Sequence, residues 1–167
     1  MKKRVLRKYD GHKLLWFRLA LVFVAILVFM IAVFRLIIGV STVSGHSMDT
    51  TLRDGQTVVF NRLKQYYDYG DIVYIRMASG EKYVKRVIGR PGDVIDIHDG
   101  KLFVNGKEET GDYINGKTNA VPSLVKYPLT LTDGQYFTVG DNRGVSVDSR
   151  SYGPVIKGQI RGVIFIK

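Results

Sequence analysis

Sixteen consecutive uncharged residues, Leu19–Phe34, constrain the fold of this chain more than any other feature. They read LALVFVAILVFMIAVF, and shorter apolar stretches continue beyond Arg18 and Arg35. A helix that crosses a bilayer needs about 20 apolar residues, and arginines near its ends can extend to the polar interface. A buried core helix fits less well, because the run is apolar on all faces. The run therefore predicts a transmembrane anchor over residues 14–40.

Positive charge is concentrated on the N-terminal side of the run. Residues 1–40 carry eight Lys/Arg and one acid, whereas residues 41–167 carry seventeen and fourteen. Because positive charge stays on the cytoplasmic side, we expect residues 1–13 to be a basic cytoplasmic arm and residues 41–167 an extracytoplasmic domain. The protein would cross the cell (plasma) membrane once. A cleaved signal peptide ending near Gly39-Val40-Ser41 is the alternative, but its apolar core would span only roughly 7–15 residues.

The weak charge of residues 41–167, a net +3, argues against a nucleic-acid partner, because such domains carry their basic residues on the folded part. The chain has no cysteines, which excludes disulfides and thiolate metal sites. The three histidines are scattered, and no glycine-rich phosphate loop joins a strand to a helix. We therefore expect neither a metal nor a cofactor.

Beyond residue 40 the sequence predicts a mainly β domain. Short segments are rich in β-branched and aromatic residues, and several alternate polar and apolar side chains. The predicted strands are Thr57–Asn61, Asp71–Arg76, Tyr83–Ile88, Asp93–His98, Lys101–Asn105, Tyr136–Val139 and Val163–Lys167. Asp99-Gly100 predicts a hairpin turn in which both residues have φ > 0. We expect a barrel-like, multi-stranded ectodomain without a further long helix, and a loop-rich excursion at Thr110–Thr130.

The segment Ser44–Leu52, SGHSMDTTL, contains serine, histidine and aspartate within nine residues. A Ser/His/Asp site is the first hypothesis for such a cluster. His46 is adjacent to Ser47, however, and adjacent side chains of an extended chain point to opposite faces. His46 is therefore badly placed to deprotonate Ser47, and His98 could do so only if the fold delivered it.

A lysine that is neutral near pH 7 can replace histidine as the base. Burial among apolar groups lowers a lysine pKa because it disfavours the charged form. Lys85 is the best candidate, since it lies in a predicted strand between Val84 and Val87. From spacing alone, however, an ordinary strand pair of Lys85 and Arg86, with the lysine in solvent, is the preferred interpretation.

Four blocks follow the apolar run in order. They are Ser44–Leu52, similar to a G-x-S-M-x-P-T-L pattern; Gly70–Val73; Tyr83–Asp93; and Gly140–Arg143 with Ser146, Asp148, Ser149 and Arg150, then Tyr152-Gly153-Pro154. Each block alone is modestly specific, but all four behind one anchor are highly specific. Together they resemble the bacterial membrane-bound type I signal peptidases, in particular the short Gram-positive members. The resemblance therefore favours a buried, neutral Lys85 over a lysine exposed to solvent.

The resemblance implies a serine endopeptidase that removes N-terminal signal peptides from exported preproteins. Ser47 would be the nucleophile and Lys85 the general base. The backbone N–H of Ser47 would hold the oxyanion, Ser146 would orient the lysine ammonium, and Met48 would line the cleft or apply the domain to the membrane. Substrate would add as an extended strand, with small residues before the cut. A supporting ion-pair and hydrogen-bond shell would comprise Asp141, Arg143, Asp148 and Arg150.

Three positions depart from the family pattern. Thr50 stands where proline is expected, which makes the turn less rigid. Gly45 stands where some relatives have a serine that adds a hydroxyl to the oxyanion hole. Gly144-Val145 replaces a common Asp-Asn pair and removes a carboxylate from the supporting shell. The last change is the one expected to affect activity or to mark a specialised paralogue.

Two other functions compete with this interpretation. Degenerate relatives serve as non-catalytic factors in pilus or surface-fibre assembly, but they lose the serine and lysine that this chain keeps at Ser47 and Lys85. A self-cleaving repressor shares Ser-Lys chemistry, but it would need a DNA-binding domain in place of Met1–Phe34. Expected partners are preprotein signal peptides and membrane lipid, with the secretion translocon or pilus components as further candidates.

Overall fold

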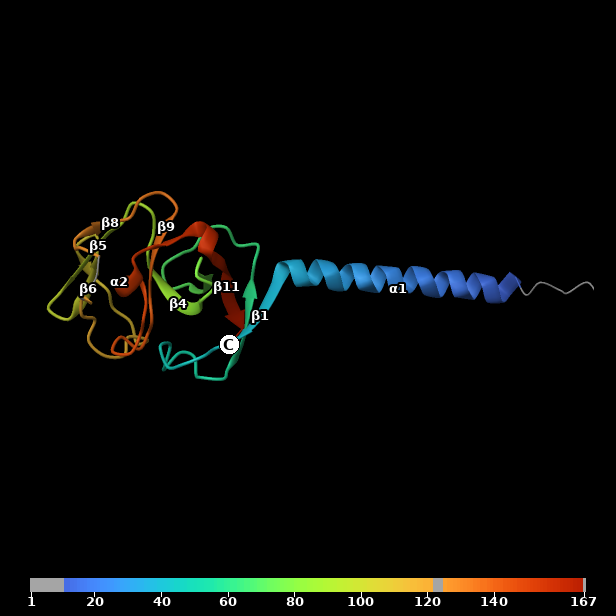
Figure 1. Ribbon diagram of the computed structural model, residues 1–167, viewed down its shortest axis with the longest axis horizontal. Helices are drawn as coiled ribbons and strands as arrows, with labels where there is room; N and C mark the ends of the chain where they lie inside the picture. Colours follow the sequence, from blue (N-terminus) through green and yellow to red (C-terminus); the bar gives the residue numbers. More distant parts are fainter. Residues whose placement is uncertain (1–10, 122–124, 167) are drawn as a thin grey trace, which may run out of the picture. The chain divides into compact units, whose positions relative to one another are not determined.

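The structure, a computed structural model, describes residues 11–121 and 125–166 (Figure 1). The chain divides into two compact units after Leu36. The first contains α1 (Gly11–Ile37), a helix of 27 residues that is long and apolar enough to cross a membrane. At 1.5 Å per residue it is about 40 Å long, which exceeds the roughly 30 Å hydrocarbon core of a bilayer. The predicted basic arm lies largely outside the described residues.

The helix differs at both ends from the predicted anchor. Its first turn includes residues 11–13, which we assigned to the arm, and it ends at Ile37. Residues 38–40, which we assigned to the anchor, belong instead to β1 (Ile38–Thr42). The apolar sequence runs without a break from helix into strand, so hydropathy alone could not show this boundary.

The second unit is built on a seven-stranded antiparallel sheet that curls into a half-barrel. The strand order is β1-β2-β11-β3-β4-β9-β10. Besides β1, the members are β2 (Thr57–Asn61), β3 (Ile72–Arg76), β4 (Lys82–Gly89), β9 (Gln135–Val139), β10 (Val155–Ile156) and β11 (Ile160–Ile166). The prediction of a mainly β, barrel-like domain is confirmed. The C-terminal strand β11 lies between β2 and β3, so the two ends of this unit meet in one sheet.

A smaller four-stranded sheet has the order β7-β6-β5-β8. Its members are β5 (Val94–His98), β6 (Lys101–Val104), β7 (Lys107–Glu108) and β8 (Leu129–Thr130). Figure 1 shows β5, β6 and β8 together at one end of the domain. Asp99 and Gly100 have φ values of 51° and 74°, which confirms the predicted hairpin turn. Two short helical turns complete the unit, α2 (Ser149–Tyr152) and the 3-10 turn η1 (Lys157–Gln159).

All seven predicted strands occur; Thr57–Asn61 matches at both ends, and no end of the others is shifted by more than three residues. The sequence did not predict β1, the two-residue strands β7, β8 and β10, or the two helical turns. Segments this short carry no periodicity, and tertiary contacts decide them.

Three apolar clusters form the core of the domain. One packs Phe60 of β2 against Met48 and Leu52 of the segment that follows β1. It holds the segment that follows β1 in place, because Met48 is 1% exposed and Leu52 is fully buried. Ser47 is thus adjacent in sequence to a side chain fixed in the core.

Candidate active site

Ser47 and Lys85 meet in the structure although they lie 38 residues apart in the sequence. Lys85 Nζ is 2.7 Å from Ser47 Oγ. Lys85 is in the middle of β4, where it pairs with Val73 of β3, and it is 2% exposed. Neighbouring Arg86 is also buried, at 9% exposure. The interpretation from spacing alone, which placed Lys85 in solvent, is therefore wrong, because both faces of β4 are covered at this point.

Burial is the main influence on the lysine. It lowers the pKa of Lys85 from 10.5 to about 8, with a smaller lowering by Arg150. The carboxylates of Asp148 and Asp141 act in the opposite direction and raise that pKa. With a pKa near 8, about one lysine in ten is neutral at pH 7. This neutral amine can accept the proton of a serine hydroxyl.

The backbone around Ser47 is fixed from the fourth block of the sequence. Asn142 N–H donates to Ser47 O at 3.0 Å, and Asn142 Nδ2 donates to His46 O at 3.1 Å. Gly140 approaches so closely that a Cβ there would lie 2.5 Å from Ser47 O and 2.2 Å from Ser146 Oγ. A glycine at this position is therefore required for the serine-bearing turn to dock.

The amide of Ser47 is available to an oxyanion. Among the described residues, it donates to no acceptor. The preceding Gly45 has φ of 87°, a conformation that side chains rarely adopt, and its own N–H donates to Asp54 Oδ1 at 2.8 Å. The conformation at Gly45 thus requires glycine, and a serine there would be strained.

The neighbours His46 and Asp49 bond to each other. His46 Nδ1 is 3.0 Å from Asp49 Oδ2, and the histidine side chain is 68% exposed. This pair leaves the Ser47 hydroxyl to Lys85. The expectation for His46 thus holds, although residues 45–50 form a bend and turns rather than the extended chain on which it rested.

Asp148 and Arg150 form one buried ion pair, at 2.9 Å between Arg150 Nε and Asp148 Oδ1. Asp148 also accepts from Gly140 N–H at 3.0 Å. Burial raises the pKa of Asp148, but the hydrogen bonds and charge of Arg150 outweigh it and hold that pKa below its usual value. Arg150 donates further to the Arg143 carbonyl at 2.8 Å. The pair therefore fixes the loop that carries Ser146.

Asp141 and Arg143 each pair with a residue that we did not predict. Asp141, fully buried, takes two hydrogen bonds from Arg86, at 2.8 and 2.7 Å. Arg143 donates to both carboxylate oxygens of Glu109, at 2.7 and 2.6 Å. Arg86 could have been identified from its position beside Lys85 in the third block. Glu109 carries no signal in the sequence, because it stands in the poorly patterned segment before the 110–130 excursion.

Ser146 lies beside the dyad without a bond to it. It is 9% exposed, and its Oγ has no hydrogen-bond partner among the described residues. The hydroxyl is near enough to Asp148 to help lower the pKa of that carboxyl. The expected contact with the lysine ammonium stays a prediction.

A cleft of about 340 Å³ opens at Ser47. Ser41–Ser44 line one part of it and Lys82–Val84 of β4 another. Met48 also lines the cleft. Of the two roles expected of Met48, lining the cleft fits its position, whereas a side chain 1% exposed has no surface to offer a bilayer. Within the described residues, no group of three or more His, Asp or Glu side chains is placed to hold a metal ion.

Comparisons with known proteins identify the family of this chain. Residues 16–167 match the family described as signal peptidase, peptidase S26. Signal peptidase IB of Staphylococcus aureus is 35% identical over 140 residues, which cover 74% of this chain and 73% of the relative. Signal peptidase I of Bacillus licheniformis is 37% identical over 133 residues, covering 72% and 70%.

A solved structure is similar as well. The crystal structure of a signal peptidase I from Enterococcus faecalis V583 superposes with a TM-score of 0.51 at 28% identity, covering 60% of this chain and 97% of that one. The resemblance inferred from the four blocks is confirmed, and the chain belongs to the signal peptidase family, peptidase S26.

Proposed function

We propose that this protein is a signal peptidase I that removes N-terminal signal peptides from preproteins, with Ser47 as nucleophile and Lys85 as general base. The observation that carries the proposal is the 2.7 Å separation of Lys85 Nζ and Ser47 Oγ, made by a lysine that is 2% exposed. The family and the named relatives support the activity.

The reaction begins when neutral Lys85 takes the hydroxyl proton of Ser47 as Oγ attacks the scissile carbonyl. The oxyanion that forms accepts a hydrogen bond from the Ser47 N–H, which has no other acceptor among the described residues. Protonated Lys85 then gives its proton to the leaving amine, and the signal peptide remains as an ester on Ser47. Lys85 finally activates the water that hydrolyses this ester.

The substrate would lie in the cleft at Ser47 as an extended strand. Ser41–Ser44 and Lys82–Val84 both line this cleft. An extended peptide there gains main-chain hydrogen bonds, while shallow pockets select small side chains before the cut. Ser146 would orient the lysine ammonium, and the buried pairs of Asp141, Arg143, Asp148 and Arg150 would hold the surrounding loops.

The apolar helix and the family together indicate a membrane-anchored protein. We place the residues before the helix in the cytoplasm, the anchor in α1, and the catalytic domain that follows Ile37 outside the plasma membrane, because the excess positive charge precedes the helix. Membrane lipid and the translocon that delivers preproteins would be its neighbours.

A non-catalytic role in pilus or surface-fibre assembly is not favoured. Such a role leaves no reason to retain a buried lysine at hydrogen-bond distance from a serine, since an unneeded buried cation only destabilises the fold.

Cleavage of a purified preprotein by the full chain in detergent tests the proposal. Ser47→Ala and Lys85→Ala should each abolish cleavage, with unchanged circular dichroism. His46→Ala is the matched control, because His46 contacts Asp49 rather than Ser47, and it should cleave at the wild-type rate. Full activity in either dyad variant would refute the mechanism.

A further inference from the structure

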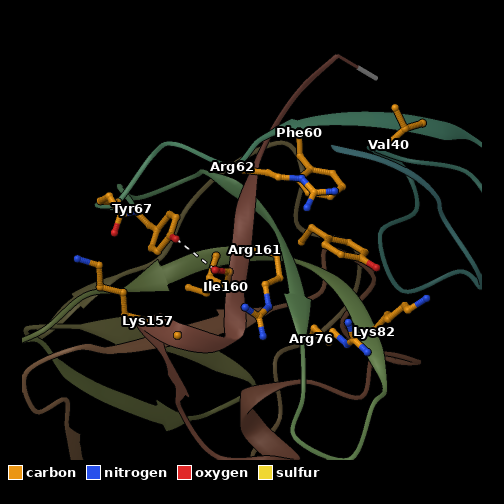
Figure 2. A pocket seen from close by; sticks show the side chains of 12 residues that line it. Val40, Phe60, Arg62, Tyr67, Arg76, Lys82, Lys157, Ile160 and Arg161 are labelled. Carbon is orange, nitrogen blue, oxygen red and sulfur yellow. Dashed lines mark hydrogen bonds between the residues drawn. The ribbon is translucent and has the colours of Figure 1, made fainter. Parts of the chain in front are cut away.

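A second hollow, separate from Ser47, is lined by cations. Its volume is about 800 Å³. The cationic side chains that line it are Arg62, Arg76, Lys82, Lys157 and Arg161. Neither aspartate nor glutamate contributes to its lining. Figure 2 shows Arg161 between Arg62 and the neighbouring pair of Arg76 and Lys82, with Lys157 farther along. We call this hollow the basic pocket.

The five cations lack the partners that other cations of the domain have. Six cations elsewhere pair with carboxylates: Lys64, Arg86, Arg90, Lys101, Arg143 and Arg150. Within the described residues, none of the five forms an ion pair. The combined positive charge of these five side chains exceeds the net charge of +3 that residues 41–167 carry as a whole. Positive charge is therefore concentrated at this one place.

The strand register brings the charges together at a cost to the fold. Arg76 of β3 and Lys82 of β4 are directly opposite each other, and like charges in such cross-strand positions are destabilising. The pairing of β11 with β3 shifts between Ile160 and Gly162, which leaves Arg161 as the extra residue of a bulge. Bulges re-aim side chains, and Arg161 lines the pocket. An anion in the pocket would relieve the repulsion.

Aromatic side chains also line the pocket. Phe60 and Tyr74 stack with ring centroids 4.6 Å apart, and the Arg62 guanidinium lies 5.4 Å from the Phe60 centroid. This contact constrains the Arg62 side chain, and a guanidinium forms two parallel hydrogen bonds to phosphate oxygens. The pocket thus suits a phosphate group bound by several forked donors.

Only a short length of chain separates the end of the membrane helix from the pocket. Arg62 N–H donates to the carbonyl of Ile37, the last residue of α1, at 2.9 Å. Val40, which also lines the pocket, lies at most about 11 Å from Ile37 by chain length, whatever direction the helix takes. The ends of a helix about 40 Å long fall in the headgroup layer of a bilayer.

We propose that the basic pocket binds the phosphate of an anionic membrane-lipid headgroup. The pocket shares Tyr74 and Lys82 with the Ser47 cleft. A headgroup bound in the pocket would therefore lie beside the cleft and would hold this part of the domain at the bilayer surface. This role is independent of the chemistry at Ser47.

Native mass spectrometry of the full chain in detergent, titrated with phosphatidylglycerol or phosphatidylcholine, tests the proposal. Wild type should retain one phosphatidylglycerol in preference to phosphatidylcholine. Each Lys or Arg near a membrane surface contributes roughly fivefold, so the variant Arg62→Gln/Arg76→Gln/Arg161→Gln should bind phosphatidylglycerol roughly a hundredfold more weakly. Its fold is checked by circular dichroism and by cleavage of a short soluble peptide, since none of the three arginines lines the Ser47 cleft.

The matched control removes the same charge from exposed lysines outside the pocket, as Lys107→Gln/Lys117→Gln/Lys126→Gln. It should bind phosphatidylglycerol as wild type does. Equal weakening in both triple variants, or none in the first, would overturn the proposal. Displacement of the lipid by millimolar inorganic phosphate would assign the pocket to a free phosphate, and displacement by an acidic peptide would assign it to a protein partner. Either result contradicts the lipid assignment.

Discussion

Lys85 Nζ lies 2.7 Å from Ser47 Oγ, and the lysine side chain that makes this contact is 2% exposed. The same burial that produces a base also destabilises the fold, because an ammonium has lost its water there. Burial of Lys85 therefore favours catalysis but lowers the stability of the fold.

The first prediction concerns this conflict. Lowering the Lys85 pKa from 10.5 to about 8 corresponds to roughly 3 kcal/mol against the charged form in the folded state. The full penalty applies below pH 8 and fades between pH 8 and 10.5, where only the unfolded chain stays protonated. Lys85→Met should thus abolish cleavage yet raise the free energy of unfolding by about 1–3 kcal/mol at pH 7.

Urea unfolding in detergent, at pH 7 and at pH 10, measures this effect. The advantage of the methionine should shrink at the higher pH. A methionine variant less stable than wild type at pH 7 would show that the lysine is not held in an unfavourable charged state.

A second prediction concerns the pair of Arg86 and Asp141. The carboxylate is fully buried and its two hydrogen bonds come from Arg86, so Asp141→Ala leaves a buried guanidinium uncompensated. We expect a loss of about 3–5 kcal/mol in the free energy of unfolding. Replacing both partners, as Arg86→Met/Asp141→Leu, should recover much of that loss. Asp133→Ala, at an exposed aspartate without an ion pair among the described residues, should change stability by less than about 0.5 kcal/mol.

A third prediction separates two glycines of the fourth block. A Cβ at residue 140 would come within 2.5 Å of Ser47 O, whereas at residue 144 it would meet nothing within 4 Å. Gly140→Ala should therefore displace the serine-bearing turn and lower kcat by about a hundredfold or more, as an atomic shift near 1 Å does. Gly144→Ala should retain wild-type kcat and stability. Equal kinetics for the two variants would contradict the close approach of Gly140.

A fourth prediction tests the role proposed for Ser146. If its hydroxyl bonds the lysine ammonium during the reaction, Ser146→Ala should lower kcat about ten- to a hundredfold with little change in KM. It should also move the midpoint of the pH–rate profile to lower pH, because the charged lysine loses a stabilising bond. A purely structural role would lower stability and leave that midpoint where it is.

The sequence predicted the elements of this molecule better than their contacts. Strands such as Thr57–Asn61 were found because β-branched and aromatic residues are concentrated there, and the helix because its apolar run is long. β1 was missed because the apolar stretch after Arg35 crosses from the helix into the strand without a polar residue. Periodicity reports which side chains are apolar, and it cannot report a strand that begins where a helix ends.

The site was predicted through resemblance to a family rather than through spacing. No local pattern indicates that Lys85 faces Ser47, since the contact depends on how β4 meets the turn after β1. Spacing even favoured the wrong environment for Lys85, because strands normally carry charged residues on a solvent face. Glu109 was missed because its partner, Arg143, lies 34 residues away across a loop.

The pH dependence of kcat/KM for a signal-peptide substrate tests the central claim most directly, because it reports the pKa of the base in the free enzyme. The account predicts that activity rises with pH through a midpoint near 8, the pKa of buried Lys85, as the ammonium loses its proton. The midpoint should persist in His46→Ala. A midpoint near 6.5 that disappears in that variant would identify histidine as the base and contradict the Ser47–Lys85 dyad.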